Sequence, residues 1–376
     1  MKILVISHNC VLATSQERMA EFARLAGDKP VLLVPPRNLE AQGMVELERD
    51  SDERYEIVRG RPLFSSAFGQ RYLQYYPFLS LLFRRVRPDL IDVHEEPWSL
   101  TAFQAVLSRR LAAPRAKVVV ESEQNVFKRF PPPFSFFERR VLRVADAMIA
   151  RNEEVAAVLR RKGFERKIIV VPNGIDLNTF RRTDSAETRR RLGLKNFVAA
   201  YLGRLVREKG VDDLIRAASM LDAAIDLLIV GDGPCGGELR ALAASLPLRG
   251  AVVWRPAVPQ RGVPDLLSCA DALVLPSRTI KNWKEQFGRI LVEAMACGVP
   301  VVASDSGAIP EVVGDAGLIF REGDVQGLRN ALDSLIGSRD LREELIRKGL
   351  QRARERYSWV AAAAAMMSLF RELVPP

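Results

Sequence analysis

The sequence is poor in histidine and cysteine and has no long apolar run. Its 376 residues include only two histidines and four cysteines, and the cysteines are scattered without a Cys-x-x-Cys pair. This pattern argues against a structural zinc site or a nucleophilic cysteine, and it is typical of reduced thiols in a cytoplasmic protein. No apolar run reaches the roughly 18 residues that a membrane-spanning helix needs. The apolar start, residues 3–7, is too short for a secretion signal and indicates a first buried strand.

What the sequence does contain is typical of a globular protein. Hydrophobic residues make up 48% and charged residues 27%, and the length predicts about two domains. The net charge of +10 is uneven, because residues 1–200 hold 34 Lys+Arg against 24 Asp+Glu, whereas the remainder holds 22 of each. The basic half therefore points towards an anionic partner.

Short apolar runs alternate with helix-length segments along the whole chain. Near-continuous apolar strands of this kind are typical of parallel sheets with helices on both faces, so each half predicts a doubly wound α/β domain. The runs are 3–7, 31–34, 89–93, 117–120, 147–150 and 168–171, then 197–202, 226–230, 251–254, 272–275, 300–303 and 317–320.

A turn at Pro172, Asn173 and Gly174 separates the two sets of runs. We place the domain boundary there. The tail from Tyr357 is an alanine-rich segment that predicts a long helix, and its residues alone leave open which domain it packs on.

The segment 285–297 combines two glutamates with a helix in which every residue from Ile290 to Cys297 except Glu293 is apolar. A carboxylate in a buried helix is costly unless something pairs with it. A helix that begins near Phe287 would place Glu293 almost two turns in, roughly 10–12 Å from Glu285. Two such carboxylates can accept hydrogen bonds from the hydroxyl groups of one extended ligand, which Gly288 would allow to approach closely. The ordinary alternative is a capping Glu285 and a Glu293 paired with an arginine.

A second candidate site lies where the predicted strand 197–202 ends. Gly203 and Arg204 turn the chain there, and Lys209 follows before the next helix. Ligands of open parallel sheets bind at the carboxyl ends of strands, and a guanidinium with an ammonium suits a diphosphate. Solvated surface charges are the ordinary alternative.

The turn 231–236 matches G-x-G-x-x-G between a predicted strand and a helix. A dinucleotide-binding fold would also need an acidic residue about 20 positions further on, and residues 253–255 contain none. We therefore interpret Gly231 and Asp232 as part of a tight turn beside a nucleotide.

Polar residues also follow the predicted strands of the first half. His8 and Asn9 come after the first strand, His94 after the third, and Glu123 and Asn125 after the fourth. We interpret this rim as the wall for a hydroxyl-rich acceptor, with structural histidines as the ordinary alternative.

The segment 125–144 interleaves five phenylalanines with lysine and arginine. This composition suits an anionic membrane surface, and it also suits nucleic acid. Core aromatics beneath a solvated basic face are the simplest interpretation.

As a set, these segments resemble the retaining glycosyltransferases of family 4. The matching pieces are LGRLVREKG, IVGDGP, LVLPS, EQFGRILVEAMACGVPVVASDSGAIPEVV, DAGLIF and the linker VPNGIDLNTF. The resemblance implies the α/β GT-B fold, in which two Rossmann-like parallel-sheet domains face each other across a cleft. Residues 1–174 would bind the acceptor, residues 175–356 would bind the nucleotide-sugar donor, and the helix 357–376 would cross back to the first domain.

The resemblance also implies roles for single residues on the donor side. Glu293 would bind the ribose hydroxyls, and Glu285 the transferred sugar, together with the amides of Phe287 and Gly288. The remaining donor-side positions would be Gly203, Gly231, Asp232, Arg289 and Ile290.

Three further residues would act at the reaction centre. Arg204 and Lys209 would hold the diphosphate leaving group, and His94 would lie on the catalytic face of the first domain. The acceptor-side positions remain His8, Asn9, Glu123 and Asn125.

The implied reaction moves a hexose from a UDP- or GDP-linked donor to a hydroxyl acceptor with retained configuration, in polysaccharide, glycolipid or glycoconjugate synthesis. We expect front-face attack in which the donor phosphate takes the acceptor proton. We expect no metal and no other cofactor, because no aspartate cluster ends a predicted strand.

Two alternatives stay open. A GT-B-type phosphorylase or a sugar-nucleotide epimerase would share the fold, and a non-catalytic basic protein could bind a membrane or nucleic acid. We expect a sugar or a lipid-linked acceptor as partner and no nucleic acid. Peripheral contact with an anionic membrane at its inner face is compatible with the basic first half.

Overall fold

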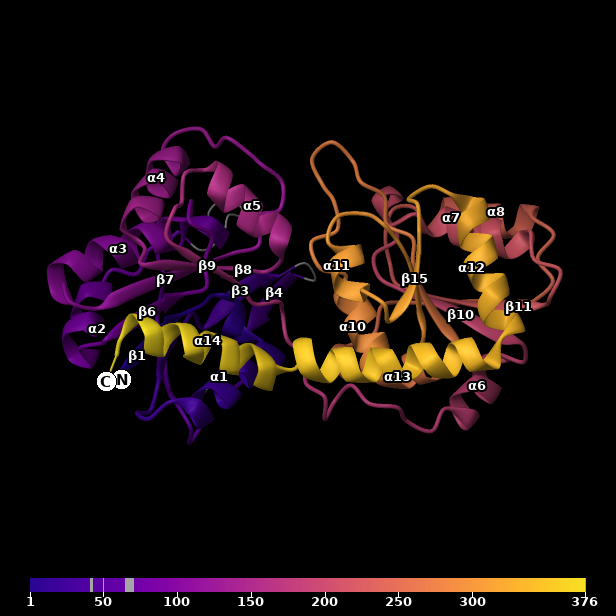
Figure 1. The fold of residues 1–376 in the computed structure, drawn as a ribbon, viewed down its shortest axis with the longest axis horizontal. Coiled ribbons are helices and arrows are strands. Elements are labelled where there is room, and N and C mark those ends of the chain that lie inside the picture. Colours follow the sequence, from indigo (N-terminus) through magenta and orange to yellow (C-terminus); the bar gives the residue numbers. More distant parts are fainter. Residues whose placement is uncertain (41–42, 50, 65–70, 376) are drawn as a thin grey trace. The chain divides into compact units, whose positions relative to one another are not determined.

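The computed structural model describes residues 1–40, 43–49, 51–64 and 71–375, and the chain forms two compact units. The first unit comprises Met1–Gly174 together with Trp359–Pro376, and the second comprises Ile175–Ser358. The chain therefore passes between the units twice, after Gly174 and after Ser358 (Figure 1).

The first unit is built on a sheet of seven described strands in the order β5-β2-β1-β6-β7-β8-β9, and every neighbouring pair is parallel. All residues of β1, β2, β6 and β8 are buried, as expected for strands covered on both faces. The strands are β1 (Ile3–Ile6), β2 (Val31–Val34), β5 (Glu56–Arg59), β6 (Leu90–Val93), β7 (Lys117–Ser122), β8 (Ala147–Ala150) and β9 (Lys167–Val170).

Helices cover both faces of this sheet in two separate apolar layers. One layer contains α2 (Leu79–Val86), α3 (Leu100–Ala112), α4 (Phe134–Val144) and α5 (Glu153–Arg161), and the other contains α1 (Ala13–Leu25) and α14 (Trp359–Leu373). Phe22 of α1 meets Phe370 of α14 edge to face, with ring centroids 5.5 Å apart. The C-terminal helix is therefore part of the first unit's core.

Two features of the first unit are not predicted by the sequence pattern. The edge strand β5 is exposed or half-buried, so it lacks a continuous apolar run. The strands β3 (Arg37–Glu40) and β4 (Gly43–Glu46) pair antiparallel as a separate sheet. Their sequences alternate poorly between apolar and polar residues, which hides them from a pattern of period two.

The second unit contains a parallel sheet in the order β12-β11-β10-β13-β14-β15. Its strands are β10 (Phe197–Leu202), β11 (Ile225–Val230), β12 (Val252–Arg255), β13 (Ala272–Leu275), β14 (Val301–Ser304) and β15 (Gly317–Phe320). Its helices are α6 (Ala186–Leu192), α7 (Val211–Ser219), α8 (Gly236–Ser245), α9 (Val263–Ser268), α10 (Arg289–Ala296), α11 (Ile309–Val313), α12 (Val325–Gly337) and α13 (Arg339–Arg356). All twelve predicted strands therefore occur, and the predicted fold of two parallel-sheet α/β domains is confirmed.

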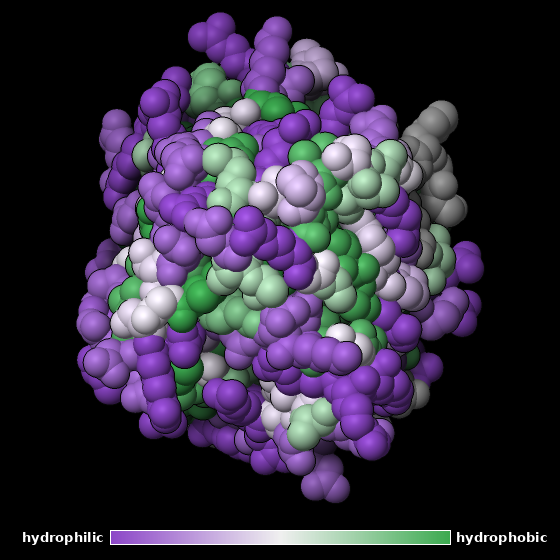
Figure 2. Space-filling view, turned by 90° about the vertical axis from the view of Figure 1, so that its right-hand side faces the viewer, coloured by the Kyte–Doolittle hydropathy of each residue, from purple (hydrophilic) through white to green (hydrophobic). Residues whose placement is uncertain are grey.

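The outer helices of the second unit bury one side and leave the other in water. In α12 the buried residues are Leu328, Leu332 and Leu335, at helical spacing. Figure 2 shows the end of the structure where Figure 1 places α8 and α12, and hydrophilic residues cover much of that face with hydrophobic residues between them. Within the described part of the chain, no helix combines the length and the apolar character needed to cross a bilayer.

Candidate functional site

The second unit brings Lys209 and Glu285 into direct contact beyond the carboxyl ends of β10 and β13. Lys209 Nζ lies 2.5 Å from Glu285 Oε2, and Ser277 Oγ donates a hydrogen bond to the same oxygen at 3.1 Å. The ammonium also lies 4.9 Å from the ring centroid of Trp283, within range of a cation–π interaction. Glu285 is only 8% exposed, and this lysine compensates its buried charge.

The backbone of Glu285 is fixed by the loop that follows β14. Ala308 N donates to Glu285 O at 3.0 Å. Gly307 has φ of +57°, and a Cβ at this position would lie 2.2 Å from the same carbonyl oxygen. A glycine is therefore required at 307, both for its conformation and for the close approach of the two loops.

Glu293 is buried in α10 and is paired within its own helix. Arg289 Nε donates to Glu293 Oε1 at 2.9 Å, and Gln260 Nε2 lies 3.4 Å from the same oxygen. Burial raises the pKa of Glu293, and the charge of Arg289 opposes that rise. Glu293 is thus paired with an arginine, as in the ordinary alternative. Both hydrogen bonds go to Oε1, and Oε2 accepts none within the described residues.

The helix that carries Glu293 begins later than predicted. It starts at Arg289 and not near Phe287, because Gly288 precedes it with φ of +68°. Glu293 is therefore the fifth residue of α10, just over one turn in. A Cβ on Gly288 would lie 2.9 Å from Leu291 Cδ1, the end of a flexible side chain, so the positive φ is what favours glycine at this position.

The neighbouring donor-side positions are divided between core and surface. Phe287 is buried against Tyr357, with ring centroids 5.6 Å apart. Ile290 is half-buried and Arg289 is exposed. Arg289 and Glu293 are therefore the two charged residues of α10.

The two glycine turns lie against each other at the ends of β10 and β11. Gly231 has φ of +144°, and a Cβ there would lie 1.9 Å from Gly203 O. Leu205 N donates to Asp232 O at 2.9 Å, which links the two loops. The Arg204 side chain is exposed on this edge.

The first unit places a buried cluster of charges at the carboxyl ends of β6, β7 and β8. Glu121, in β7, accepts hydrogen bonds from Arg18 of α1, one of them at 3.1 Å, and from Arg151, which follows β8. All three side chains are almost fully buried. Two guanidiniums thus share one carboxylate inside the unit.

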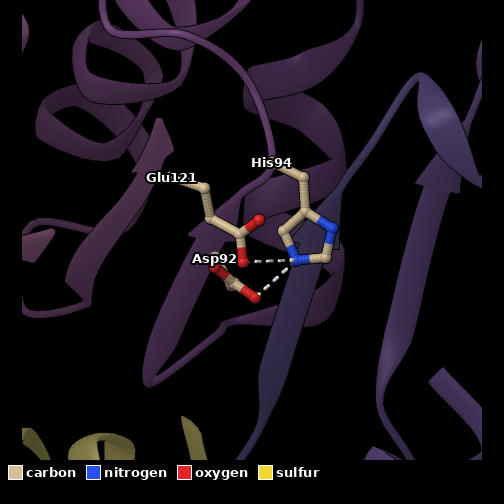
Figure 3. Close-up of side chains that lie close together, drawn as sticks. All are labelled: Asp92, His94 and Glu121. Atoms are coloured by element: carbon tan, nitrogen blue, oxygen red, sulfur yellow. Dashed lines mark hydrogen bonds and ion pairs between the residues drawn. The ribbon is translucent and has the colours of Figure 1, made fainter. Parts of the chain in front are cut away.

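His94 adds a second layer to this cluster. Its Nε2 lies 2.7 Å from Asp92 Oδ2 and 3.5 Å from Glu121 Oε1, as Figure 3 shows. Burial, together with the positive charges of Arg18 and Arg151, lowers the pKa of His94 well below its usual range. Burial raises the pKa of Asp92 to about 6 against the pull of the two arginines. His94 is therefore neutral at pH 7.

The other predicted acceptor-side residues are also held by protein partners. His8 Nδ1 lies 2.5 Å from Glu95 Oε1, and Asn125 Nδ2 donates to Glu154 at 3.1 Å. Glu123 lies 3.5 Å from Arg151 Nε. Asn9 begins a short 3-10 helix directly after His8.

Asp92, His94 and Glu121 offer three ligand atoms within 4.8 Å of one another, which raises the question of a metal ion. The two guanidiniums of Arg18 and Arg151 already balance the two carboxylates of this group. A divalent cation would have to bind beside two buried guanidiniums that already pair with Glu121, which is costly. These residues therefore do not suit a metal site.

Several buried polar atoms at this rim have no hydrogen-bond partner within the described residues. They are Ser7 Oγ, Asp92 Oδ1, Glu95 Oε2, Trp98 Nε1 and Arg151 Nε. Buried groups of this kind are normally satisfied by water or by a ligand. The rim thus combines buried charges with unused hydrogen-bonding capacity.

The prediction for the first unit missed Arg18, Asp92, Glu121 and Arg151. A signal for two of them exists, because Asp92 and Glu121 stand inside or directly after apolar strand runs, where charged residues are rare. No sequence pattern singles out Arg18, which occupies one helical position among several polar ones. Its partner Glu121 is 103 residues away.

Comparisons with known proteins agree with the two units. A family model described as "Glycosyltransferase Family 4" matches residues 13–179, and one described as "Glycosyl transferases group 1" matches residues 184–352. Each model thus matches a large part of one unit.

Similar curated proteins are also glycosyltransferases. A D-inositol 3-phosphate glycosyltransferase of Nocardia farcinica is 33% identical over 62% of this chain and 54% of its own length. TuaC of Bacillus subtilis, named for teichuronic acid biosynthesis, is 29% identical over 76% of this chain and 74% of its own. The chain spans about half the length of the inositol phosphate enzymes that it matches.

Solved structures with low identity share the whole fold. A glycosyltransferase from Rickettsia africae has a TM-score of 0.76 at 16% identity, over 100% of this chain and 98% of that one. Sucrose-phosphate synthase from Thermosynechococcus elongatus has a TM-score of 0.71 at 20% identity, over 99% of both chains. Anabaena HepE, solved with UDP and glucose, has a TM-score of 0.70 at 20% identity, over 99% of this chain and 100% of that one.

Proposed function

The chain belongs to glycosyltransferase family 4 with the GT-B fold, and on this premise we propose that it transfers a hexose from a nucleotide diphosphate sugar to an acceptor hydroxyl with retained configuration. The observation that carries the proposal is the pairing of Lys209 with the buried Glu285 at the carboxyl edge of the second unit's sheet. This edge is where open parallel sheets bind their ligands.

The donor diphosphate binds to Arg204 and Lys209. The exposed guanidinium of Arg204 can form two parallel hydrogen bonds to phosphate oxygens. Glu285 and Trp283 hold the Lys209 ammonium in place before the donor arrives. A cation fixed in advance stabilises developing negative charge without reorganising during the reaction.

The ribose of the donor binds to Glu293. Arg289 and Gln260 both hold Oε1, which fixes the carboxylate while Oε2 remains for a ribose hydroxyl. Among nucleotides we propose UDP before GDP, because the similar structure of Anabaena HepE was solved with UDP.

In the reaction, the acceptor hydroxyl oxygen forms a bond to the anomeric carbon as the bond from that carbon to the phosphate oxygen breaks. The departing phosphate takes the hydroxyl proton from the same face of the sugar. Arg204 and Lys209 stabilise the negative charge of the leaving diphosphate, and Glu285 orients the transferred sugar. The two cations supply the role of a metal ion, so we propose that none is required.

The acceptor binds at the rim of the first unit. There Ser7, Glu95 and Trp98 keep buried polar atoms without a partner within the described chain. Such groups suit a ligand with several hydroxyls. The names of the similar D-inositol 3-phosphate glycosyltransferases indicate an acceptor with several hydroxyls for those enzymes.

The first experiment is a thermal-shift panel with UDP, GDP and ADP on the wild type and Glu293→Gln. A nucleotide at 100 times its dissociation constant should stabilise the protein by about 2.7 kcal/mol. We expect a shift with UDP that Glu293→Gln loses. The matched control is Glu238→Gln, which changes an exposed glutamate of the same unit and should keep the shift.

Product analysis separates the alternatives. Retention is checked by NMR of the product formed from the UDP-sugar that binds. A sugar 1-phosphate formed only with inorganic phosphate would identify a phosphorylase, and a new UDP-sugar without acceptor would identify an epimerase. Loss of the UDP shift in both glutamate variants would contradict the role of Glu293.

A further inference from the structure

An apolar and basic surface covers three neighbouring helices of the first unit, and the proposed transfer reaction does not use it. We propose that this surface, formed by the exposed sides of α2, α3 and α4, docks on an anionic lipid bilayer. The inference does not depend on which donor or acceptor the enzyme takes.

The three helices present their exposed sides in one direction. Their buried sides contribute Phe83, Ala105 and Val141 to a single apolar layer on one face of the sheet. α3 packs against α2 and against α4, and Figure 1 shows the three helices following one another along the unit. The sides opposite to that layer therefore form one continuous surface.

Large apolar side chains recur on this surface. Each of the three helices, or the residue that caps it, exposes at least one, with between 45% and 74% of the side chain in water. They are Phe78, Leu81, Leu107, Leu111 and Phe136. Isolated exposed leucines are ordinary, but a set that spans adjacent helices marks an interaction surface.

The charges among these side chains are of one sign. The three helices contain seven arginines and a single acidic residue, Glu138. Glu138 is largely buried and paired with Lys162. Exposed arginines follow the apolar residues by one helical turn, as Arg110 follows Leu107 and Arg139 follows Phe136.

This pairing of chemistry distinguishes a bilayer from other polyanions. Arginines are attracted to the phosphates of anionic lipids, and neighbouring leucine and phenylalanine side chains insert into the acyl boundary. Nucleic acid would engage the arginines but would gain nothing from exposed leucines such as Leu107 and Leu111. The occupant that uses both features is a membrane surface.

The test measures sedimentation of the full chain with vesicles of phosphatidylcholine alone or with 30% phosphatidylglycerol. The charge variant combines Arg110→Ser, Arg139→Ser and Arg143→Ser. Each basic residue near an anionic surface strengthens binding several-fold, so we expect the affinity for the anionic vesicles to fall roughly a hundredfold. The apolar variant, Leu111→Ser with Phe136→Ser, should also bind more weakly.

The matched control removes three arginines from the second unit. Arg347→Ser, Arg354→Ser and Arg356→Ser change exposed residues of α13 and lower the net charge equally. We expect this control to bind within about threefold of the wild type. All changes are at exposed positions, and an unchanged melting temperature of each variant confirms that it folds.

Three results would overturn the inference. The wild type could fail to bind anionic vesicles, or the α13 control could lose as much affinity as the charge variant, which would indicate a net-charge effect. Duplex DNA could bind as tightly as vesicles and be indifferent to the apolar variant, which would indicate a general polyanion site. The thermal shift with UDP is measured on the same proteins, so a failed donor site and a failed membrane surface are distinguished.

Discussion

The carboxyl edges of the two parallel sheets differ in whether their cations are exposed or buried. At the edge of the second unit, Lys209 and Glu285 are paired while Arg204 stays exposed. At the edge of the first unit, Arg18 and Arg151 are buried and both form ion pairs with Glu121. One edge thus keeps an exposed cation, whereas the two buried cations of the other edge are already paired with a carboxylate.

This difference agrees with the ligand proposed for each unit. A diphosphate carries negative charge, which a cation held in place beforehand stabilises. A sugar hydroxyl carries none, and it gains from groups with fixed directions. The buried cluster of the first unit would then serve to hold its rim rigid, which the largest predicted effect can test.

Glu121→Ala should destabilise the first unit by about 3–5 kcal/mol, because it leaves two buried guanidiniums without their carboxylate. The free energy is measured by denaturant unfolding. The control is Glu56→Ala, which removes the partner of Arg85 from an exposed pair and should cost less than about 1 kcal/mol. Equal costs would mean that burial of the cluster adds nothing.

Lys209→Ala should lower kcat by about a hundredfold to a thousandfold, the range found when one preorganised donor to a developing charge is lost. The control is Arg207→Ala, in the same short 3-10 turn but strongly exposed, and it should change kcat little. Steady-state kinetics with saturating donor checks both. A similar loss in the two variants would assign the effect to the loop as a whole and not to the Lys209–Glu285 pair.

Gly307→Ala should cost about 1–3 kcal/mol of stability and lower kcat about tenfold, since its Cβ would press on the carbonyl of Glu285. Gly323→Ala is the control, because Gly323 also has positive φ but has open space around it. It should show the backbone strain alone, about 1 kcal/mol, with normal kcat. Unchanged kcat in Gly307→Ala would show that the position of Glu285 is not critical.

The two edges also differ in how far the sequence predicts them. The edge of the second unit is built from two short segments, Gly203 to Lys209 and Glu285 to Glu293, which motif spacing singles out, although Lys209 and Glu285 themselves lie 76 residues apart. The rim of the first unit depends on Arg18 and Glu121, which meet only when α1 folds onto the sheet. Apolar runs predict all the central strands, but the half-exposed β5 and the polar β3–β4 hairpin carry no such signal.

His94 of the first unit's buried cluster should make the stability of the folded chain depend on pH. His94 is buried beside Asp92 and Glu121, and burial together with Arg18 and Arg151 lowers its pKa well below the usual 6.5. The unfolded chain therefore binds a proton below pH 6.5 that the folded chain does not. Stability that is present above pH 6.5 is lost as the pH falls, by up to about 1.4 kcal/mol per pH unit.

Asp92 acts in the opposite direction, because its pKa is raised to about 6 in the folded chain. It gains a proton in the folded state first, so its contribution to stability grows as the pH falls below about 6. The two effects are separated by comparing the wild type with His94→Gln between pH 7.5 and 5.5. Asp92 remains in both proteins, and only the wild type carries the histidine.

We expect the difference in unfolding free energy between wild type and His94→Gln to decline by about 1 kcal/mol per pH unit below pH 6.5. Denaturant unfolding at four or five pH values measures it. Parallel curves for the two proteins would mean that His94 gains its proton in the folded state as readily as in the unfolded chain. The rim of the first unit would then be open to water, and its contrast with the exposed edge of the second unit would not hold.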